Sequence, residues 1–157
     1  MSSQRGATQD AEAARARWTE LLRSHGLRVT GPRLAVLDVL EKRSHLSAEE
    51  VAAEVRARHG SVSTQAVYDV LHTLSSVGLL RAIEPAGSAT RYERRVGDNH
   101  HHLVCRQCGR VCDVPCVTGA APCLEPSETA GFRVDEAEVT FWGICPDCQH
   151  RSSTKES

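Results

Sequence analysis

The sequence predicts an α+β protein in which helices and a β-hairpin form the first half and a small α/β unit forms the second. Apolar residues recur at helical spacing up to about residue 78, and two short strand patterns follow them. After residue 100 the pattern changes to short strands, among which lie two Cys-x-x-Cys pairs. We therefore expect domains at 11–95 and 100–150, joined by a hinge at 96–99.

Composition limits the class of protein. With 157 residues and 40% hydrophobic side chains, the chain can bury one core or two small ones. No apolar run approaches the length of a membrane span, and the first residues lack the apolar core of a signal peptide, so we expect a cytoplasmic protein without a membrane partner. The polar ends, 1–10 and 151–157, are expected to be disordered. Seven cysteines, four of them in metal-type pairs, argue against a secreted disulfide framework.

Four helices are expected in the first half. The first covers 11–24, and the second begins at Thr30-Gly31-Pro32, where a proline in the first turn loses no hydrogen bond. Ser47 and Glu50 form a capping box that begins the third helix. Ser63 caps the fourth helix, whose apolar stripe continues to a glycine stop.

Two short strands, 79–83 and 90–94, follow the fourth helix around a turn that contains proline and glycine. Three helices and a hairpin form a winged helix-turn-helix, which is a DNA-binding motif. Residues 1–97 carry 14 Lys and Arg against 11 Asp and Glu, whereas residues 98–157 carry 5 against 9. The first half is therefore the better partner for a polyanion.

The free face of the fourth helix is polar near the helix N-terminus and is a candidate for contacts with base edges and phosphates. Its side chains are Thr64, Gln65, Tyr68, Asp69 and His72. Asp69 would be repelled by phosphates, although five arginines could offset that repulsion, namely Arg28, Arg33, Arg81, Arg91 and Arg95. A small helical core with a solvated polar face therefore remains the alternative interpretation.

The second half is predicted to form a compact α/β unit. Strands are expected at 102–105, 110–114, 132–134 and 138–144, with irregular chain over 115–126 and a short helix at 124–130. A unit of about 50 residues is too small to be stable without a metal or a partner. We therefore expect this domain to dimerise.

Two Cys-x-x-Cys turns, Cys105 to Cys108 and Cys145 to Cys148, supply four thiolates suited to a tetrahedral Zn²⁺. Gly109 can take the positive φ that such a turn often needs. Because the pairs lie far apart in the sequence, the zinc would connect distant parts of the second domain. Four cysteine ligands leave no coordination position open, which argues against a zinc hydrolase.

A run of histidines, His100-His101-His102, precedes the first cysteine pair. In a strand, His100 and His102 point to one side and His101 to the other. Imidazoles together with carboxylates suit Fe²⁺ or Mn²⁺, whereas thiolates prefer Zn²⁺. A further metal site would combine His101 with Glu128, Glu136 or Glu138, but a solvated His101 is the favoured interpretation.

Five sequence blocks, in order between residues 27 and 148, resemble the Fur (ferric uptake regulator) family of metal-dependent bacterial repressors. They are Leu27-Arg28-Val29-Thr30-x-x-Arg33, Gln65-Ala66-Val67-Tyr68, Arg91-Tyr92-Glu93, His100-x-His102-x-x-Cys105-x-x-Cys108-Gly109 and Gly143-x-Cys145-x-x-Cys148. Within the family, Val111-Cys112-Asp113-Val114-Pro115-Cys116 and Ala121-Pro122-Cys123-Leu124 are similar to the actinobacterial FurA/CatR branch, repressors of catalase-peroxidase.

The resemblance implies a homodimer with N-terminal DNA-binding domains and C-terminal dimerisation domains. It implies structural zinc at the four paired cysteines and a regulatory Fe²⁺ or Mn²⁺ between the domains. The ligands it implies for the regulatory metal are His45, Glu93, His100, His102 and Asp113. It also implies that Tyr68 packs against a thymine, whereas Asp69 departs from the residue that is usual in the family.

The signal to which such a repressor responds has three candidate forms. In the first, peroxide oxidises His45 or His100 at the bound iron, and repression of catalase-peroxidase or other oxidative-stress genes is lifted. The peroxide-responsive branch of the family associates an aspartate at 113 with this sensitivity. In the second, thiols outside the zinc set are the sensor, namely Cys112, Cys116 and Cys123, although Cys112 is slightly favoured as a small buried side chain. In the third, the regulator responds only to the level of iron or zinc.

Overall fold

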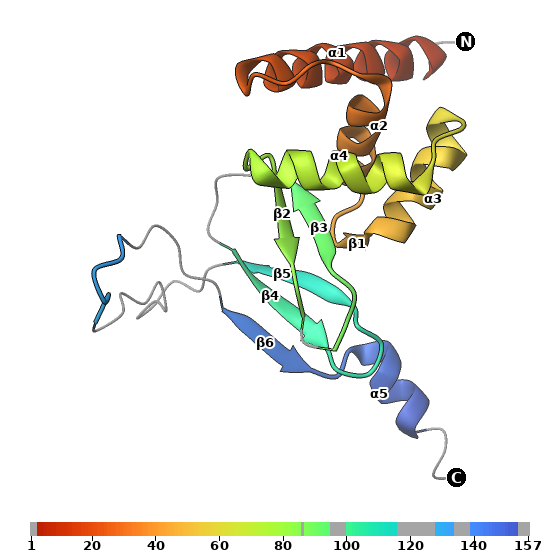
Figure 1. The fold of residues 1–157 in the computed structure, drawn as a ribbon. Helices are drawn as coiled ribbons and strands as arrows, with labels where there is room; N and C mark the ends of the chain where they lie inside the picture. Colours follow the sequence, from red (N-terminus) through yellow and green to blue (C-terminus); the bar gives the residue numbers. More distant parts are fainter. Residues whose placement is uncertain (1–2, 86, 95–99, 116–127, 134–138, 154–157) are drawn as a thin grey trace. The chain divides into compact units, whose positions relative to one another are not determined.

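The structure, a computed structural model, describes residues 3–85, 87–94, 100–115, 128–133 and 139–153 (Figure 1). The chain divides into two compact units, Met1–Val96 and Gly97–Ser157. The expected hinge at 96–99 lies outside the described residues. Within the described ranges, none of the helices combines the length and the apolar composition needed to cross a bilayer.

The described part of the first unit contains four helices and a small antiparallel sheet (Figure 1). The helices are α1 (Ser3–Ser24), α2 (Gly31–Lys42), α3 (Ala48–His59) and α4 (Thr64–Ser76). The strands are β1 (Leu46–Ser47), β2 (Leu80–Ile83) and β3 (Arg91–Arg94), in the order β1-β3-β2. The winged helix-turn-helix is confirmed, and β1 is a strand that the sequence did not predict.

Local sequence signals set where these helices begin. The side chain of Thr30 accepts a backbone N–H of the first turn of α2 at 3.4 Å. Ser47 and Glu50 form the expected capping box, in which each side chain accepts the backbone N–H of the other, at 3.2 and 2.8 Å. Ser63 caps α4 with its hydroxyl alone, which accepts the backbone N–H of Ala66 at 3.1 Å. These bonds satisfy amides that the first turn of a helix leaves without a partner.

The core of the first unit lies between the apolar faces of the helices and the edge of β2. Its members include Trp18, Leu22, Leu37, Leu40, Val51, Val55, Val67, Leu71, Leu74 and Leu80, all buried. The apolar stripe expected on α4 is therefore buried, and the polar face of that helix is left outside. This packing fixes which side chains of α4 an outside partner can reach.

The first helix begins much earlier than the sequence predicted. The expectation of disorder over 1–10 is wrong from Ser3 onward, because α1 already includes that residue. Polar composition suggested disorder, but polar residues also extend an existing helix, since adding a residue costs far less than nucleating a helix. The buried Trp18 and Leu22 hold the nucleus of α1 in the core.

The second unit is a three-stranded sheet followed by a helix. Its elements are β4 (His100–Cys105), β5 (Val111–Pro115), β6 (Thr140–Gly143) and α5 (Pro146–Ser153). β4 is central, β5 pairs with it antiparallel and β6 pairs with it parallel. The strands expected at 102–105 and 110–114, and the last one within 138–144, are confirmed with small shifts in their bounds.

The strand expected at 132–134 is wrong in its described part. Ala130 and Gly131 have φ of 48° and 82°, and the N–H of Phe132 donates to the carbonyl of Thr129 at 2.8 Å, so the chain makes a turn there. The apolar Phe132 suggested a buried strand, yet its side chain is 77% exposed. Of the helix expected at 124–130, only residues 128–130 are described, and they are not helical.

Helix α5 was not predicted, and the expected disordered tail at 151–157 is wrong up to Ser153. Pro146 begins the helix at a position where its missing N–H costs nothing. The N–H groups of Cys148 and Gln149 both donate to the carbonyl of Cys145 at 3.0 Å. The segment is short and polar, so hydrophobic periodicity gives no signal for it. Residues 154–157 lie outside the described chain.

Candidate metal centres

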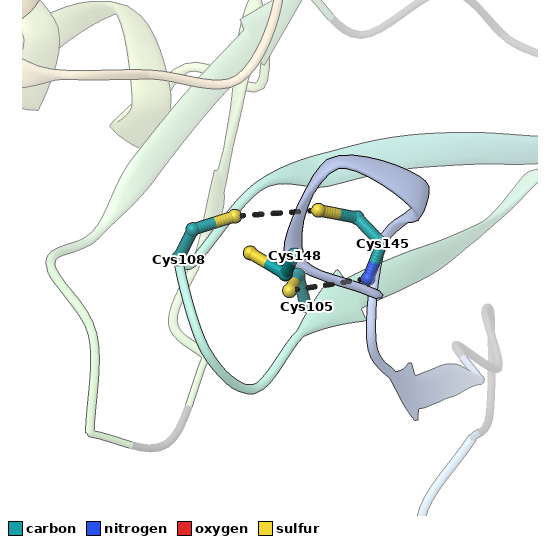
Figure 2. Close-up of side chains that lie close together, drawn as sticks. All are labelled: Cys105, Cys108, Cys145 and Cys148. Carbon is teal, nitrogen blue, oxygen red and sulfur yellow. Dashed lines mark hydrogen bonds between the residues drawn. The ribbon is translucent and has the colours of Figure 1, made fainter. Parts of the chain in front are cut away.

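Four cysteine side chains converge at one end of the second unit, as Figure 2 shows. Cys105 ends β4, Cys108 lies in the turn after it, and Cys145 and Cys148 flank the start of α5. All four sulfur atoms lie within 4.8 Å of one another, and Cys108 Sγ is 3.7 Å from Cys145 Sγ. Thiolates about 2.3 Å from a tetrahedral Zn²⁺ are about 3.8 Å apart, so this separation fits the ion.

The cysteine cluster is set by local backbone geometry. Gly109 has the expected positive φ of 72°, and its N–H donates to the carbonyl of Cys105 at 2.9 Å, which closes the first turn. The backbone N–H of Cys145 donates to Cys105 Sγ at 3.3 Å. This bond is the main reason that the pKa of Cys105 is lowered to about 6. Cys105 is thus ready to bind a metal as a thiolate.

Cys148 has the opposite environment. Burial raises the pKa of its thiol to about 11, even though the guanidinium of Arg151 donates to its sulfur at 3.1 Å. A metal ion displaces the proton from such a thiol, so metal binding and deprotonation occur together at this position. Together the four sulfur atoms form a closed donor set of the kind that Zn²⁺ prefers.

The second candidate cluster begins with His45 and Glu93 in the first unit. His45 Nε2 is 2.9 Å from Glu93 Oε2, and the His45 side chain is 10% exposed. His45 has φ of 61°, a left-handed conformation that is uncommon for residues other than glycine. Its N–H donates to the carbonyl of Tyr92 at 3.0 Å, which holds it beside β3. Strained residues of this kind cluster at functional sites.

Two arginines surround this pair. Arg81 lies opposite Glu93 across the β2–β3 ladder, with Arg81 Nη1 3.7 Å from Glu93 Oε1. Arg91 Nη1 donates to the carbonyl of His45 at 3.3 Å and to Glu50 Oε2 at 2.6 Å. One oxygen of Glu93 therefore faces an imidazole and the other faces a guanidinium.

In the second unit, His102 and Asp113 lie directly opposite each other on β4 and β5. His102 Nε2 is 3.5 Å from Asp113 Oδ1, and His102 is buried whereas Asp113 is exposed. His100 belongs to β4 by its backbone, opposite Pro115, but its side chain lies outside the described part. Each unit by itself therefore offers one described imidazole and one carboxylate as possible metal ligands.

His101 is buried, so the expectation of a solvated histidine is wrong. Its Nδ1 accepts the backbone N–H of Val139 at 3.3 Å, and its ring meets the ring of Phe141 edge-on, 6.4 Å between centroids. The parallel pairing of β6 with β4 places both residues beside it. Of the glutamates considered with it, Glu128 is exposed. Glu136 and Glu138 lie outside the described residues.

Cys112 is exposed in the single chain, so the slight preference for a small buried side chain is wrong there. It lies on β5 opposite Leu103, which in turn lies opposite Phe141 on β6. Leu103 and Phe141 are 46% and 42% exposed, so this face of the sheet is apolar and accessible. Cys116 and Cys123 lie outside the described residues.

The free face of α4 is polar, as expected, and Thr64, Gln65 and Tyr68 are exposed on it. Gln65 Nε2 donates to Asp69 Oδ1 at 2.9 Å. This bond orients the Asp69 carboxylate along the helix. Tyr68 is 42% exposed, which leaves its ring available for contact with a partner.

The two basic candidates before α2 have different roles. Arg28 is exposed, whereas Arg33 Nη1 donates to the carbonyl of Arg28 at 2.7 Å. Arg33 therefore also shapes the loop that precedes α2.

From the sequence, Arg81 and Arg91 were candidates only for offsetting the repulsion between Asp69 and phosphates. The contacts that they and Arg151 make with the candidate ligands were not predicted. Arg81 and Arg91 reach theirs through strand pairing, and Arg151 reaches Cys148 from α5. The contact between Arg81 and Glu93 could have been predicted, because a short hairpin places residues of its two strands opposite each other. Arg151 gave no such signal, since α5 itself was not predicted.

Comparisons with known proteins agree with this architecture. The model of the ferric uptake regulator family matches residues 24–142, a stretch that ends before Cys145. A transcriptional regulator of Mycobacterium tuberculosis, FurA, is 55% identical over 131 residues, which cover 83% of this chain and 89% of that protein.

Two solved structures share the fold. The ferric uptake regulator Fur of Helicobacter pylori, described as having three functional metal binding sites, has a TM-score of 0.65 at 22% identity, covering 88% of this chain and 93% of that one. The peroxide stress regulator of Campylobacter jejuni has a TM-score of 0.60 at 26% identity, covering 82% and 97%.

Proposed function

Because the chain belongs to the ferric uptake regulator family, whose model matches residues 24–142, we propose that it is a peroxide-responsive repressor that binds operator DNA as a homodimer. Membership makes it a metal-responsive transcriptional regulator and not an enzyme. The proposal adds the signal, hydrogen peroxide, and the targets, catalase-peroxidase or other oxidative-stress genes. Because the proposed partner is operator DNA, the proposal also includes a cytoplasmic location for the protein.

The observation that carries the proposal is the separation of two kinds of metal donor. Four cysteine sulfur atoms lie together at one end of the second unit, whereas imidazole and carboxylate pairs lie elsewhere on the chain. A thiolate set holds Zn²⁺ tightly, but nitrogen and oxygen donors suit Fe²⁺ or Mn²⁺, which exchange with the cell's supply. One chain can therefore combine a zinc site that stabilises its fold with a second metal site that responds to the cell's metal supply.

We assign the structural zinc to Cys105, Cys108, Cys145 and Cys148. Their sulfur atoms form a complete tetrahedral donor set, so substrate or peroxide finds no open coordination position. The ion would connect the end of β4 to the start of α5. In a unit this small, such a connection supplies stability that the apolar core alone does not.

We assign the regulatory metal, Fe²⁺ or Mn²⁺, to His45 and Glu93 of the first unit with His100, His102 and Asp113 of the second. The donor chemistry supports this assignment, since each described pair offers one imidazole and one carboxylate and is incomplete alone. An ion shared by both units would fix the angle of the DNA-binding units in the dimer. Loss of the ion would leave that angle unfixed. The two DNA-binding units would then no longer match the spacing of paired half-sites.

The operator contacts are assigned to the exposed face of α4, through Thr64, Gln65 and Tyr68, with Arg28 on the DNA backbone. Hydroxyl and amide groups can bond to base edges, and the ring of Tyr68 can pack on a thymine methyl group. The carboxylate of Asp69 accepts a hydrogen bond from Gln65, and the charge of Arg28 would offset its repulsion of phosphates. Arg33 contributes indirectly, by holding the backbone at Arg28.

Bound Fe²⁺ would activate peroxide as a catalyst, and the two electrons that reduce the peroxide would come from a histidine ring held beside it. His45 is fixed by its backbone bond to Tyr92 and by Glu93, so its ring stays beside the metal position. One oxygen atom from H₂O₂ would enter a ring C–H of His45 or His100, and the other would leave as water. The modified ring would be a poorer ligand, so the metal and then the operator would be released.

The test uses protein loaded anaerobically with Fe²⁺ and bound to fluorescent operator DNA, selected beforehand from random sequences by the protein itself. Peroxide should release the DNA, and mass spectrometry should find one added oxygen on His45 or His100. The control is the same protein loaded with Mn²⁺, which should stay bound because Mn²⁺ does not activate peroxide in this way. Release of DNA from both forms without histidine oxidation would refute this mechanism.

A second candidate function is thiol-based sensing, favoured by the exposure of Cys112. Replacement of Cys112, Cys116 and Cys123 by serine separates the two routes. If the triple variant releases DNA at the wild-type peroxide concentration, the thiols outside the zinc site are not the sensor. Simple iron or zinc homeostasis is distinguished by the metal supply, because it predicts no release by peroxide while metal is in excess.

A further inference from the structure

Helix α5 brings a cation to the sulfur cluster from outside the ligand set. Arg151, one turn after Cys148, donates from Nη2 to Cys148 Sγ at 3.1 Å. Gln149 Nε2 donates to the carbonyl of Ile144 at 2.6 Å, which ties α5 to the chain before it, and within the helix Ser152 Oγ donates to the carbonyl of Cys148 at 3.0 Å. Arg151 is therefore positioned by a structured helix.

The sulfur atoms of the cluster are protected in different ways. Cys105 Sγ accepts a backbone N–H, from Cys145, which no side-chain substitution removes. Cys148 is buried, and the hydrogen bond that it accepts from a side chain comes from Arg151. Four thiolates and one Zn²⁺ carry two net negative charges, so a nearby guanidinium withdraws electron density from a strongly basic cluster.

We propose that Arg151 is a positioning residue that lowers the reactivity of the Cys148 thiolate and so protects the structural zinc from the peroxide that the regulatory site detects. The inference rests on the proposed function, because it assumes zinc at the four cysteines and peroxide as the signal. It assigns α5 a role beyond covering the cluster. The helix keeps the structural zinc site unreactive while the regulatory metal site reacts with peroxide.

The reaction that Arg151 slows is the two-electron oxidation of zinc-bound thiolates. The sulfur of Cys148 attacks one oxygen of H₂O₂, the O–O bond breaks, and a sulfenic acid and one hydroxide form. A second thiolate of the cluster then attacks that sulfur, giving a disulfide and releasing the oxygen as a second hydroxide, and both hydroxides take up protons from the solvent. Two sulfur atoms lose one electron each, peroxide gains two, and Zn²⁺ leaves without a change in its charge.

The size of the effect follows from the basicity of the thiolate. A hydrogen bond from a charged donor lowers the basicity of its acceptor by a factor of about ten to one hundred. The rate of thiolate attack rises as roughly the square root of basicity. Removing the Arg151 bond should therefore speed oxidation about three- to tenfold.

The experiment measures zinc release from dimers that have first been freed of regulatory metal with EDTA. Hydrogen peroxide is added at several concentrations, and released zinc is followed with a coloured chelator, giving a rate constant per zinc bound at the start. Arg151→Gln, which removes the charge but keeps a polar side chain, should release zinc about three- to tenfold faster than wild type. Arg151→Lys, which keeps a cation, should stay close to wild type.

The matched control is Arg133→Gln. Arg133 is an exposed arginine of the same unit that lies outside both Cys-x-x-Cys turns, and its variant should release zinc at the wild-type rate. Equal rates for Arg151→Gln and wild type would overturn the proposal. Equally fast release by Arg151→Gln and Arg151→Lys would also overturn it, because steric cover and not charge would then be responsible. Since iron is absent, failure of histidine oxidation at the regulatory site cannot produce either result.

Discussion

The carboxylate of Glu93 is shared between two partners of its own unit. His45 Nε2 lies 2.9 Å from one oxygen, and Arg81 Nη1 lies 3.7 Å from the other. The side chains of Glu93 and Arg81 are 3% and 13% exposed, so water screens their interaction weakly. A divalent cation at Glu93 would meet the positive charge of Arg81 at short range. Arg81 should therefore oppose metal binding at Glu93.

Replacing Arg81 by glutamine should tighten Mn²⁺ binding, by about tenfold, because a competing positive charge is removed from beside a ligand. Free Mn²⁺ counted by electron paramagnetic resonance during a titration gives the affinity directly. Arg58→Gln is the control, since it breaks a 2.9 Å ion pair with Glu54 on α3 and leaves the candidate ligands intact. Weaker Mn²⁺ binding in Arg81→Gln would mean that Arg81 orients Glu93 for the metal.

Residue identity predicts the type of ligand at each candidate metal centre. It does not predict which side chains and strands surround those ligands. Cysteine spacing was sufficient to predict the thiolate cluster, because two tight turns place their sulfur atoms locally. The burial of His101 was beyond such reasoning, since it depends on β6 pairing in parallel with β4 from a distant part of the chain. Strand alternation assigns a residue to a face, and only the neighbouring elements decide whether that face meets water.

Among the elements, the N-termini of helices were predicted best from the sequence. The capping box at Ser47 and the Ser63 cap predicted α3 and α4 because both act within one turn. Strand β1 has two residues and exists only through pairing with β3, so no local pattern marks it. Helix α5 is short and polar, and its position follows from the cysteine cluster at its start.

Asp38 connects α2 to the end of α3. Its carboxylate accepts hydrogen bonds from Lys42 Nζ at 2.9 Å and from His59 Nε2 at 3.0 Å. Burial raises the pKa of Asp38, but the bonds and charges of Lys42 and His59 together outweigh it and lower the pKa below 3.8. Because the folded pKa is the lower one, ionised Asp38 stabilises the fold above about pH 4, and this contribution is lost as the pH falls through the folded pKa.

Asp38→Asn should therefore lower the free energy of unfolding by about 0.5 kcal/mol at pH 6, a small value because the pair is partly solvated. The difference from wild type should shrink as the pH falls below about 4, where the wild-type carboxylate takes up a proton. Urea unfolding at several pH values measures both. Asp10→Asn, on the exposed part of α1, is the control. A difference that stays constant down to pH 2.5 would contradict this account.

At the scale of the whole molecule, the two units differ in what stabilises them. The first has a core built from its helices, whereas the described part of the second buries few apolar side chains, notably Val104 and Val111, beside Cys105 and Cys148. Apolar burial contributes about 25 cal/mol per Å², so a unit with so little of it depends on other interactions. Zinc at the cysteine cluster is the interaction that we propose.

Removal of zinc with a strong chelator should unfold the second unit and leave the first folded. Trp142 lies in the second unit and Trp18 in the first, so a Trp18→Phe variant reports the second unit alone by fluorescence. Its emission should shift to that of an exposed tryptophan, while circular dichroism keeps most of the helical signal of the first unit. Unchanged Trp142 emission after complete zinc removal would show that the unit is stable without the ion.

The sheet of the second unit presents an apolar face that fits a second copy of the chain. Leu103 and Phe141 lie opposite each other on β4 and β6 and are 46% and 42% exposed. Apolar side chains adjacent on a flat strand surface gain by mutual burial, and a symmetric dimer buries the same patch twice. Leu103→Glu would place a charge in that contact on both copies. It should weaken the dimer at least tenfold, as loss of an interface anchor does.

The same substitution tests whether dimerisation is needed for operator binding. Sedimentation measures the dimer, and fluorescence anisotropy measures binding to a two-fold symmetric operator and to one half-site. Leu103→Glu should lose affinity for the symmetric operator far more than for the half-site, because α4 and its contacts are unchanged in each monomer. Phe132→Glu is the control, since Phe132 is 77% exposed in a turn outside the sheet. Equal loss of affinity for both DNAs, or a dimer as stable as that of the control, would mean that another surface joins the copies.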